Sequence, residues 1–357
     1  MTDCHARLSF GKHRMSWDCP LPLTGSERIQ MAHGSGGRQM NQLIETVFRS
    51  VFETEQTVAA DAAVLTLPSD RIAVSTDSFV IQPLFFPGGD IGSLAVHGTV
   101  NDLLMRGAIP HRLTASFILE ESLAIATLNT LVQSMASAAQ AAGVQICAGD
   151  TKVVERGKAD GLYITTTGIG WLPPDRQIGP QQIQVGDAIV INGDLGRHGI
   201  AVMACREGLE LELPFASDVA SLRSPVLGLL EAGIDLHCLR DLTRGGLASA
   251  LNELAAVGVG MDIEAKAIPV DPAVAGVCEI LGLDPLQVAN EGRFVAFLPT
   301  DQVAIALQIL RQIWPEQEPR CIGIVQSATP GLVRLRQPFG SDRLLEMLSG
   351  EQLPRIC

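Results

Sequence analysis

Apolar residues recur at helical spacing in some segments of the chain and in short continuous runs in others. Between Met40 and Phe52 they fall three and four positions apart, which predicts a helix with one buried face. Similar patterns predict helices at residues 93–106, 123–142, 198–209, 244–257 and 301–313. Apolar runs predict strands at residues 71–75, 162–165, 188–191, 294–298 and 332–335. Because the two kinds of element are mixed along the whole chain, the pattern predicts a mixed α/β fold.

A proline-rich segment interrupts this pattern near the middle of the chain. Residues 170–180 contain three prolines in eleven positions, so we expect a linker between two domains there. Residues 1–28 have no periodicity and are expected to form a loose extension. The predicted division is an extension at 1–28, an N-terminal domain at 29–175, a C-terminal α/β domain at 176–345 and a flexible tail at 346–357.

Composition and charge narrow the class of protein. The 357 residues are enough for two domain cores, and the net charge of -13 argues against a nucleic-acid or anionic membrane surface. The eight cysteines form no Cys-x-x-Cys pair, so a zinc site has no local support. They are scattered through apolar stretches, and no apolar run reaches membrane length. We therefore expect a cytoplasmic protein with reduced cysteines and neither nucleic-acid nor membrane partners.

The last residue, Cys357, is a thiol on a chain end that has only one covalent connection. Pro354 stiffens the approach to it, and Arg355 favours the thiolate while the terminal carboxylate opposes it. This arrangement suits an arm that carries a substrate. The alternative is a chain that ends in cysteine by chance.

Two glycine-rich segments precede predicted helices. Gly34, Ser35, Gly36 and Gly37 stand before the helix near Met40, where backbone N–H groups and the helix N-terminus could bind a phosphate. A flexible glycine turn is the alternative. Asp241 precedes Gly245 and Gly246 at the start of the helix predicted from residue 244, with Thr243 as the expected N-cap.

Single acidic residues interrupt otherwise apolar segments. They are Asp61, Asp77 (expected at the end of its strand), Asp102 (beside Asn101) and Asp150. A further acid, Glu291, stands just before the strand predicted at 294–298, where a simple turn residue is the alternative. Buried carboxylates are costly unless they are paired or metal-bound, and Mg²⁺ prefers carboxylate oxygens together with nucleotide phosphates. For any single acid, a helix cap or a turn is the commoner role.

Five short motifs together resemble a known family. HGSGG (33–37), GDTKVV (149–154), DLTRGG (241–246), ANEG (289–292) and the terminal PRIC (354–357) are similar, in this order, to the HypE family of hydrogenase maturation factors. That family consists of carbamoyl dehydratases of the PurM-like ATP-binding superfamily. The resemblance covers residues 29–357 and implies a two-domain PurM-like fold with an N-terminal ATP-binding domain and a flexible C-terminal tail.

The resemblance also implies a reaction. The carbamoyltransferase HypF would place a carbamoyl group on Cys357, and ATP would phosphorylate the amide oxygen so that dehydration leaves a thiocyanate. The cyano group would pass to the iron centre on the HypC–HypD complex, destined for [NiFe]-hydrogenase. A homodimer is implied as well.

By the same resemblance, the motif residues receive roles. Cys357 carries the substrate, Glu291 is the general base and Lys152 stabilises negative charge on the activated oxygen or phosphoryl group. Asp61, Asp102 and Asp241 would bind Mg²⁺. The rest of the ATP would be bound by Gly34, Ser35, Gly36, Gly37, Asp77, Asn101 and Asp150.

Two other functions are alternatives to this one. Selenophosphate synthetase shares the ATP chemistry but has its reactive thiol or selenol near the N-terminus, followed closely by lysine. Cys4 and Cys19 lack that setting. A nucleotide-regulated scaffold for maturation partners would bind ATP without turning over a carbamoylated protein.

Overall fold

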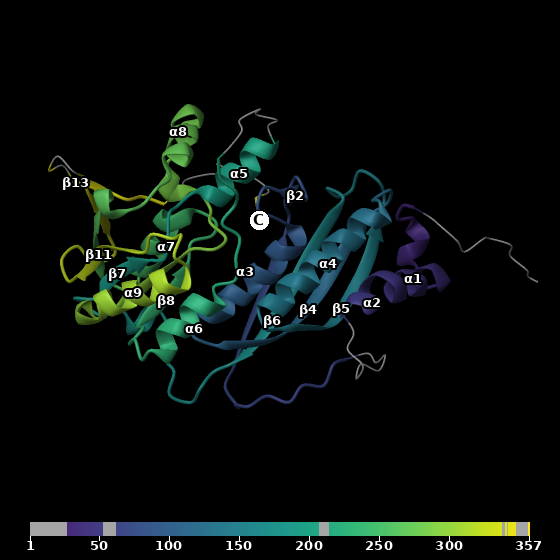
Figure 1. Ribbon diagram of the computed structural model, residues 1–357, viewed down its shortest axis with the longest axis horizontal. Helices are drawn as coiled ribbons and strands as arrows, with labels where there is room; N and C mark the ends of the chain where they lie inside the picture. The colour runs from purple at the N-terminus through teal and green to yellow at the C-terminus, as the bar shows by residue number, and fades with distance from the viewer. Residues whose placement is uncertain (1–26, 53–61, 207–213, 338–339, 341, 348–355) are drawn as a thin grey trace, which may run out of the picture.

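The computed structural model describes residues 27–52, 62–206, 214–337, 340, 342–347 and 356–357. Two β-sheets with their helices lie beside each other, one in each half of the chain (Figure 1). A small hairpin of β2 (Phe85–Phe86) and β3 (Gly89–Asp90) precedes helix α3 (Ile91–Met105).

The N-terminal sheet has four strands in the order β1-β6-β4-β5. Only β4 and β5 run parallel to each other. The helices α3 and α4 (Ile125–Ala141) pack on one face of this sheet (Figure 1). The strands are β1 (Ile72–Phe79), β4 (Ile109–Glu120), β5 (Gln145–Val154) and β6 (Leu162–Trp171). A 3₁₀ turn (Met31–Gly34), α1 (Arg38–Leu43), a π-helical turn (Ile44–Arg49) and α2 (Ser50–Phe52) lie near β5.

Helices α3 and α4 cover one face of the N-terminal sheet, whereas the other face is more exposed. Along β6, buried residues such as Ile164 alternate with partly exposed ones, because successive side chains point to opposite faces. The face away from α3 carries Val74 and Ile118, which are 60% and 38% exposed. Among the described residues this face therefore presents apolar side chains to solvent.

The C-terminal sheet has seven strands in the order β13-β12-β9-β11-β7-β10-β8. The strands are β7 (Ala188–Ile191), β8 (Cys238–Asp241), β9 (Gly260–Glu264), β10 (Phe294–Leu298), β11 (Arg320–Gln326), β12 (Val333–Arg336) and β13 (Asp342–Leu344). The helices are α5 (Arg197–Arg206), α6 (Arg223–Glu231), α7 (Gly246–Ala255), α8 (Pro272–Leu281) and α9 (Val303–Ile313). Short 3₁₀ turns lie at Pro180–Gln182, Ala265–Ala267, Pro285–Gln287 and Thr300–Gln302.

Helix α3 joins the two halves. Almost all of its residues are buried, because one side covers the N-terminal sheet and the other contacts the C-terminal half. Asn101 donates to the carbonyl of Ala220 at 3.0 Å and accepts from the backbone N–H of Leu222 at 2.8 Å. Asn101 on α3 therefore links the two halves.

The predicted helices and strands are confirmed where the structure describes them, with three local differences; the last three residues of the helix predicted at 198–209 lie outside the described residues. The helix expected at 40–52 contains the π-helical turn. Strand β1 continues to Phe79, so Asp77 lies within it and not at its end. Thr243 is not the N-cap of α7: Gly245 takes that position with a φ of 80°, a conformation that glycine adopts without steric cost. The sequence does not predict every element: strands β2, β3, β4, β5, β8, β9, β11 and β13 and helices α6 and α8 are absent from the expected set. In β4 and β5, polar residues break up the apolar pattern.

The expected linker lies between the two halves. Strand β6 ends at Trp171, and residues 172–179 lead to the 3₁₀ turn before β7. Of the expected N-terminal extension, residues 1–26 lie outside the described part of the chain. Glu27 and Arg28 contact the segment before α4, where the carbonyl of Glu27 accepts from Ile125 at 2.9 Å. None of the helices in the described segments has the length and apolar character that a membrane span requires.

Candidate active site between the two halves

Two acidic side chains meet beneath helix α3. Strand alternation turns Ser75 and Asp77 of β1 toward α3, which carries Thr99 and Asp102 one turn apart. Ser75 Oγ donates to Asp102 Oδ2 at 2.5 Å, and Thr99 Oγ1 donates to Asp77 Oδ2 at 3.3 Å. The structure thus brings together two acids that lie 25 residues apart in the sequence.

Asp241, at the end of β8, is a third acid in this cluster. Burial, followed by the charge of Asp102, raises the pKa of Asp241 to about 7. Burial also raises the pKa of Asp77 to about 6, with Asp102 adding its charge and a hydrogen bond. Nearby like charges and low dielectric both disfavour the ionised form. The three acids form what we call the carboxylate cluster: Asp77, Asp102 and Asp241.

The carboxylate cluster has the donor chemistry of a magnesium site. Its hard oxygen ligands and uncompensated negative charge fit a divalent cation. In the described part of the chain, however, no three His, Cys, Asp or Glu side chains are already arranged as a ligand set. Asp61, the remaining expected ligand, lies outside the described residues.

Removing one charge from the carboxylate cluster should change how stability depends on pH. Because the pKa values of Asp77 and Asp241 are raised, the folded protein binds more protons than the unfolded chain between about pH 4 and pH 7. The cluster's contribution to the free energy of unfolding is therefore lost as the pH rises through this window. We expect the Tm of Asp102→Asn to exceed that of the wild type near pH 8 by on the order of a few degrees, and by less near pH 5. Calorimetry in a chelator would measure both differences, and equal differences would contradict the expectation.

Glu291 lies next to the carboxylate cluster on the loop before β10. Its backbone N–H and that of Gly292 donate to the two carboxylate oxygens of Asp218, at 3.3 and 3.1 Å. Its carbonyl accepts from Asn101 at 3.4 Å. The side chain is 3% exposed, and Oε1 has no hydrogen-bond partner. Burial, followed by the charge of Asp241, raises the pKa of Glu291 well above its usual value. An unpaired buried carboxyl is typical of a functional site.

The end of the chain lies in the same place. Ile356 is 3% exposed and forms an antiparallel bridge with Ile81, and the N–H of Val80 donates to the terminal oxygen of Cys357 at 3.2 Å. Burial raises the pKa of the Cys357 thiol to about 12; the charge of Glu291 raises it further, and Arg244 opposes this. The last two residues are therefore docked beside the candidate base. Pro354 and Arg355 lie outside the described residues.

The remaining expected site residues lie elsewhere. Lys152 and Asp150 are on β5, where their side chains pair at 3.0 Å and are 63% and 57% exposed. Gly34 packs on β5 so closely that an added Cβ would lie 2.9 Å from the Cβ of Val153. Strand β5 is at the opposite edge of the sheet from β1, about 14 Å away at the usual strand spacing. Within one chain the expected residues therefore form two separate groups. Cys357 lies with Glu291 and the carboxylate cluster, whereas Lys152 lies with Asp150 and Gly34 at the other edge of the sheet.

Sequence reasoning missed three residues that support this site. Asp218 binds the backbone of the Glu291 loop, and His198 on α5 binds the docked tail. Arg293 is 3% exposed and donates to the side chain of Asp194 at 2.8 Å. Arg293 could have been noticed as a charged residue at the start of an apolar strand. The partners of Asp218 and His198 lie far along the chain, so neither residue has a local signature.

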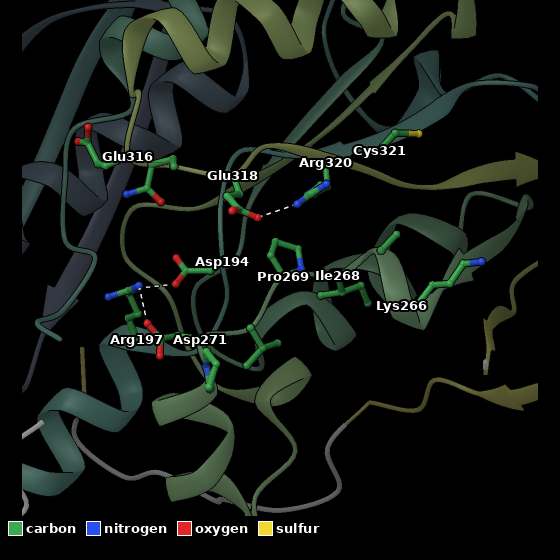
Figure 2. A pocket seen from close by; sticks show the side chains of 14 residues that line it. Asp194, Arg197, Lys266, Ile268, Pro269, Asp271, Glu316, Glu318, Arg320 and Cys321 are labelled. Atoms are coloured by element: carbon green, nitrogen blue, oxygen red, sulfur yellow. Dashed lines mark hydrogen bonds and ion pairs between the residues drawn. The ribbon is translucent and has the colours of Figure 1, made fainter. Parts of the chain in front are cut away.

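An open cavity of about 650 Å³ lies in the C-terminal half, away from the expected site residues. Arg197 spans it between Asp194 and Asp271, at 2.5 and 2.9 Å (Figure 2). These ion pairs satisfy the charged groups that line this end of the cavity. The cavity contains none of the expected catalytic, nucleotide or metal residues.

Comparisons with known proteins agree with this fold. Residues 59–172 match the N-terminal domain of AIR synthase related proteins, and residues 184–329 match the C-terminal domain. The fold and these matches define a two-domain AIR synthase related, PurM-like protein.

Relatives of nearly full length narrow the family. The chain is 49% identical over 331 residues to carbamoyl dehydratase HypE of Azotobacter vinelandii, covering 92% of this chain and 97% of the relative. The structure of HypE in complex with ATP superposes with a TM-score of 0.88 at 45% identity, covering 92% and 99% of the two chains. That of a HypE–HypF complex superposes with a TM-score of 0.75 at 43% identity, covering 86% and 99%. The chain belongs to the HypE family of carbamoyl dehydratases.

Proposed function

We propose that this protein dehydrates a carbamoyl group carried on Cys357 to a thiocyanate, at the expense of ATP. The observation that carries the proposal is the position of Cys357, docked beside the unpaired buried carboxyl of Glu291 and the carboxylate cluster. The product supplies the cyano ligand for the iron centre of [NiFe]-hydrogenase. Relatives that are named carbamoyl dehydratases, and not selenophosphate synthetases, support this choice.

The reaction needs a leaving group and a base. ATP supplies a phosphoryl group to the amide oxygen, so that phosphate can leave in place of hydroxide. The amide nitrogen then gives up two protons as the C–O bond breaks and the carbon–nitrogen triple bond forms. Glu291 has a free oxygen with which to accept one of these protons, and Asp218 and Asn101 fix its backbone.

Ionisation of Glu291 requires relief of the negative charge around it. Burial, followed by the charges of Asp241, Asp218, Asp77 and Asp102, raises the pKa of Glu291 well above its usual value and so disfavours the ionised carboxylate. Mg²⁺ held by Asp61, Asp102 and Asp241 would supply positive charge to these acids and to the ATP phosphates. Asp77 and Asn101 lie beside that group and are proposed to bind the nucleotide.

Loading and unloading of the thiol would occur with the tail undocked. A docked thiol with a pKa of about 12 is a poor nucleophile, so transfer of the carbamoyl group from HypF requires Cys357 to leave the pocket. The likeness to the HypE–HypF complex supports HypF as the donor. We propose the HypC–HypD complex as the cyanide acceptor and a cytoplasmic location, where the six described cysteines, all free of disulfides, would stay reduced.

A homodimer would bring the two groups of site residues together. The uncovered sheet face carries Val74 and Ile118 together with Lys152 and Asp150, and a second copy packed on it would bury the apolar side chains. Lys152, Asp150 and the Gly34–Gly37 segment could then serve the nucleotide bound to the other copy. In that position Lys152 would stabilise charge on the phosphoryl group.

Placing a charge on the uncovered sheet face should separate the dimer. We expect Val74→Lys to shift the protein to a monomer in sedimentation and to lower its dehydration rate by roughly tenfold or more, because the buried apolar area is lost. Ile280→Lys on α8 is the matched control, since Ile280 is 78% exposed on another face. A Val74→Lys protein that stays dimeric and active would exclude this interface.

The mass of the C-terminal peptide tests the proposed function. After incubation with HypF, carbamoyl phosphate and ATP, the Cys357 peptide should first gain a carbamoyl group and then lose one water. A protein that binds ATP but leaves the carbamoyl adduct unchanged would be the scaffold, not the enzyme.

A further inference from the structure

His198 is a buried residue with a direct contact to the docked tail. It lies on α5, is 0% exposed and packs with its ring perpendicular to that of Phe86, with 5.4 Å between the ring centroids. Its Nε2 lies 2.6 Å from the carbonyl oxygen of Ile356, and its Nδ1 lies 2.8 Å from Ser217 Oγ. Both ring nitrogens are therefore satisfied only when the tail is docked.

The hydrogen bonds around His198 have a fixed direction. A carbonyl oxygen can only accept, so Nε2–H donates to Ile356. Burial lowers the pKa of His198 and so favours the neutral ring, in which Nδ1 accepts from the hydroxyl of Ser217. The N–H of Val219 donates to the same hydroxyl oxygen at 3.1 Å. The carbonyl of Ile356 therefore fixes the tautomer, and Ser217 holds the ring by donating to Nδ1.

Ser217 is itself held by the N-terminal half. The N–H of Ser217 donates to the carbonyl of Pro87 at 2.8 Å. The backbone of Gly88 lies so close that an added Cβ there would be 2.8 Å from the carbonyl oxygen of Ser217. The next residue, Asp218, holds the backbone of Glu291 and Gly292. One turn thus supports both the imidazole that binds the arm and the loop that carries the base.

We propose that His198 is a positioning residue that latches the docked arm by its hydrogen bond to the carbonyl of Ile356. The inference rests on the proposed function, in which Cys357 must sit beside Glu291. The buried side chain of Ile356 holds the arm in the pocket, and the bond from His198 fixes the rotation and depth of the last residue. Ser217 acts through His198 by orienting the ring.

The test compares His198→Phe with His198→Gln in the full-length protein. Phenylalanine keeps a ring of similar size but cannot donate, whereas the glutamine amide can reach and donate to Ile356. Loss of the bond should raise the undocked fraction of the arm roughly tenfold, since one buried carbonyl loses its partner. Alkylation of Cys357 by iodoacetamide, followed by the mass of the C-terminal peptide, should accelerate by the same factor in His198→Phe and stay near the wild-type rate in His198→Gln.

The two steps of the reaction should respond differently to loss of the His198 bond. In single turnover from the carbamoylated protein, His198→Phe should dehydrate roughly tenfold more slowly. Its carbamoylation by HypF should not slow, because that step uses the released arm. Cys321, which is exposed on β11, serves as the internal control and should be alkylated at an unchanged rate in every variant.

Ser217→Ala covers the case in which His198→Phe does not fold. It removes the hydroxyl that orients the His198 ring and should release the arm to a smaller extent, while Ser221→Ala, in the same segment, should not release it. Equal alkylation of Cys357 in wild type, His198→Phe and Ser217→Ala would overturn the latch. The latch would also be overturned if His198→Gln and His198→Phe accelerated alkylation and slowed dehydration to the same extent. Because alkylation involves neither ATP nor a carbamoyl group, a failure of the proposed function would leave this readout intact.

Discussion

Replacing Cys357 by alanine should abolish formation of the thiocyanate while leaving the fold intact. The residue carries the substrate covalently in the proposed reaction, so no other thiol can replace it at the same position. Its side chain is partly buried against the central core, but it is small and lies on the last residue, so we expect little change in Tm. Mass spectrometry of the C-terminal peptide and calorimetry would measure the two effects.

The matched control for this change is Cys321→Ala. Cys321 is an exposed cysteine on β11, outside the carboxylate cluster and the docked tail. It should leave both carbamoylation and dehydration at the wild-type rate. Thiocyanate formed elsewhere on the Cys357→Ala protein would contradict the hypothesis that Cys357 carries the carbamoyl group.

Replacing Glu291 by glutamine should block the reaction after carbamoylation. The shape of the side chain is preserved, but the proton acceptor is lost, which typically costs about 10²–10⁴-fold in rate. HypF performs the first step, so the carbamoyl adduct should still form on Cys357 and then accumulate. We expect little loss of stability, because burial and the neighbouring acids disfavour a charge on Glu291 and the glutamine amide carries none. Single-turnover mass spectrometry would follow both steps.

Lys152→Ala is the informative companion of Glu291→Gln. If Lys152 acts on the nucleotide of the other copy, mixing the two inactive variants should form some dimers with one complete site, and part of the activity should return. Mixing that restores no turnover would place Lys152 outside that role.

Near wild-type turnover by Glu291→Gln itself would exclude Glu291 as the base, even though the family assignment would stand.

Local patterns were enough for much of the fold and for the family. The spacing of apolar residues depends on the turn of a helix and the alternation of a strand, so α3, α4 and α9 could be placed from the sequence. The short motifs with the terminal cysteine indicated the HypE family, to which the relatives assign the chain. Strands β4 and β5 escaped prediction because polar residues on their open face interrupt the apolar pattern.

The sequence also indicated which residues belong to the candidate site, but not that they lie in two separate groups. Asp77, Asp102, Asp241, Glu291 and Cys357 meet between the two sheets, whereas Lys152, Asp150 and Gly34 lie at the far edge of the N-terminal sheet. Spatial order in a sheet follows from long-range strand pairing, so the order of motifs along the chain does not reveal it.

The sequence by itself determined which residue types were available: a terminal thiol, isolated acids, glycine-rich turns and the periodicity that forms helices and strands. Only the tertiary structure decided which of them touch. His198 and Ile356 are 158 residues apart, and Asn101 and Glu291 are 190 apart, yet each pair is hydrogen-bonded. Such contacts depend on the packing of the two halves around α3, because a buried polar group takes its partner from whatever the fold brings within reach.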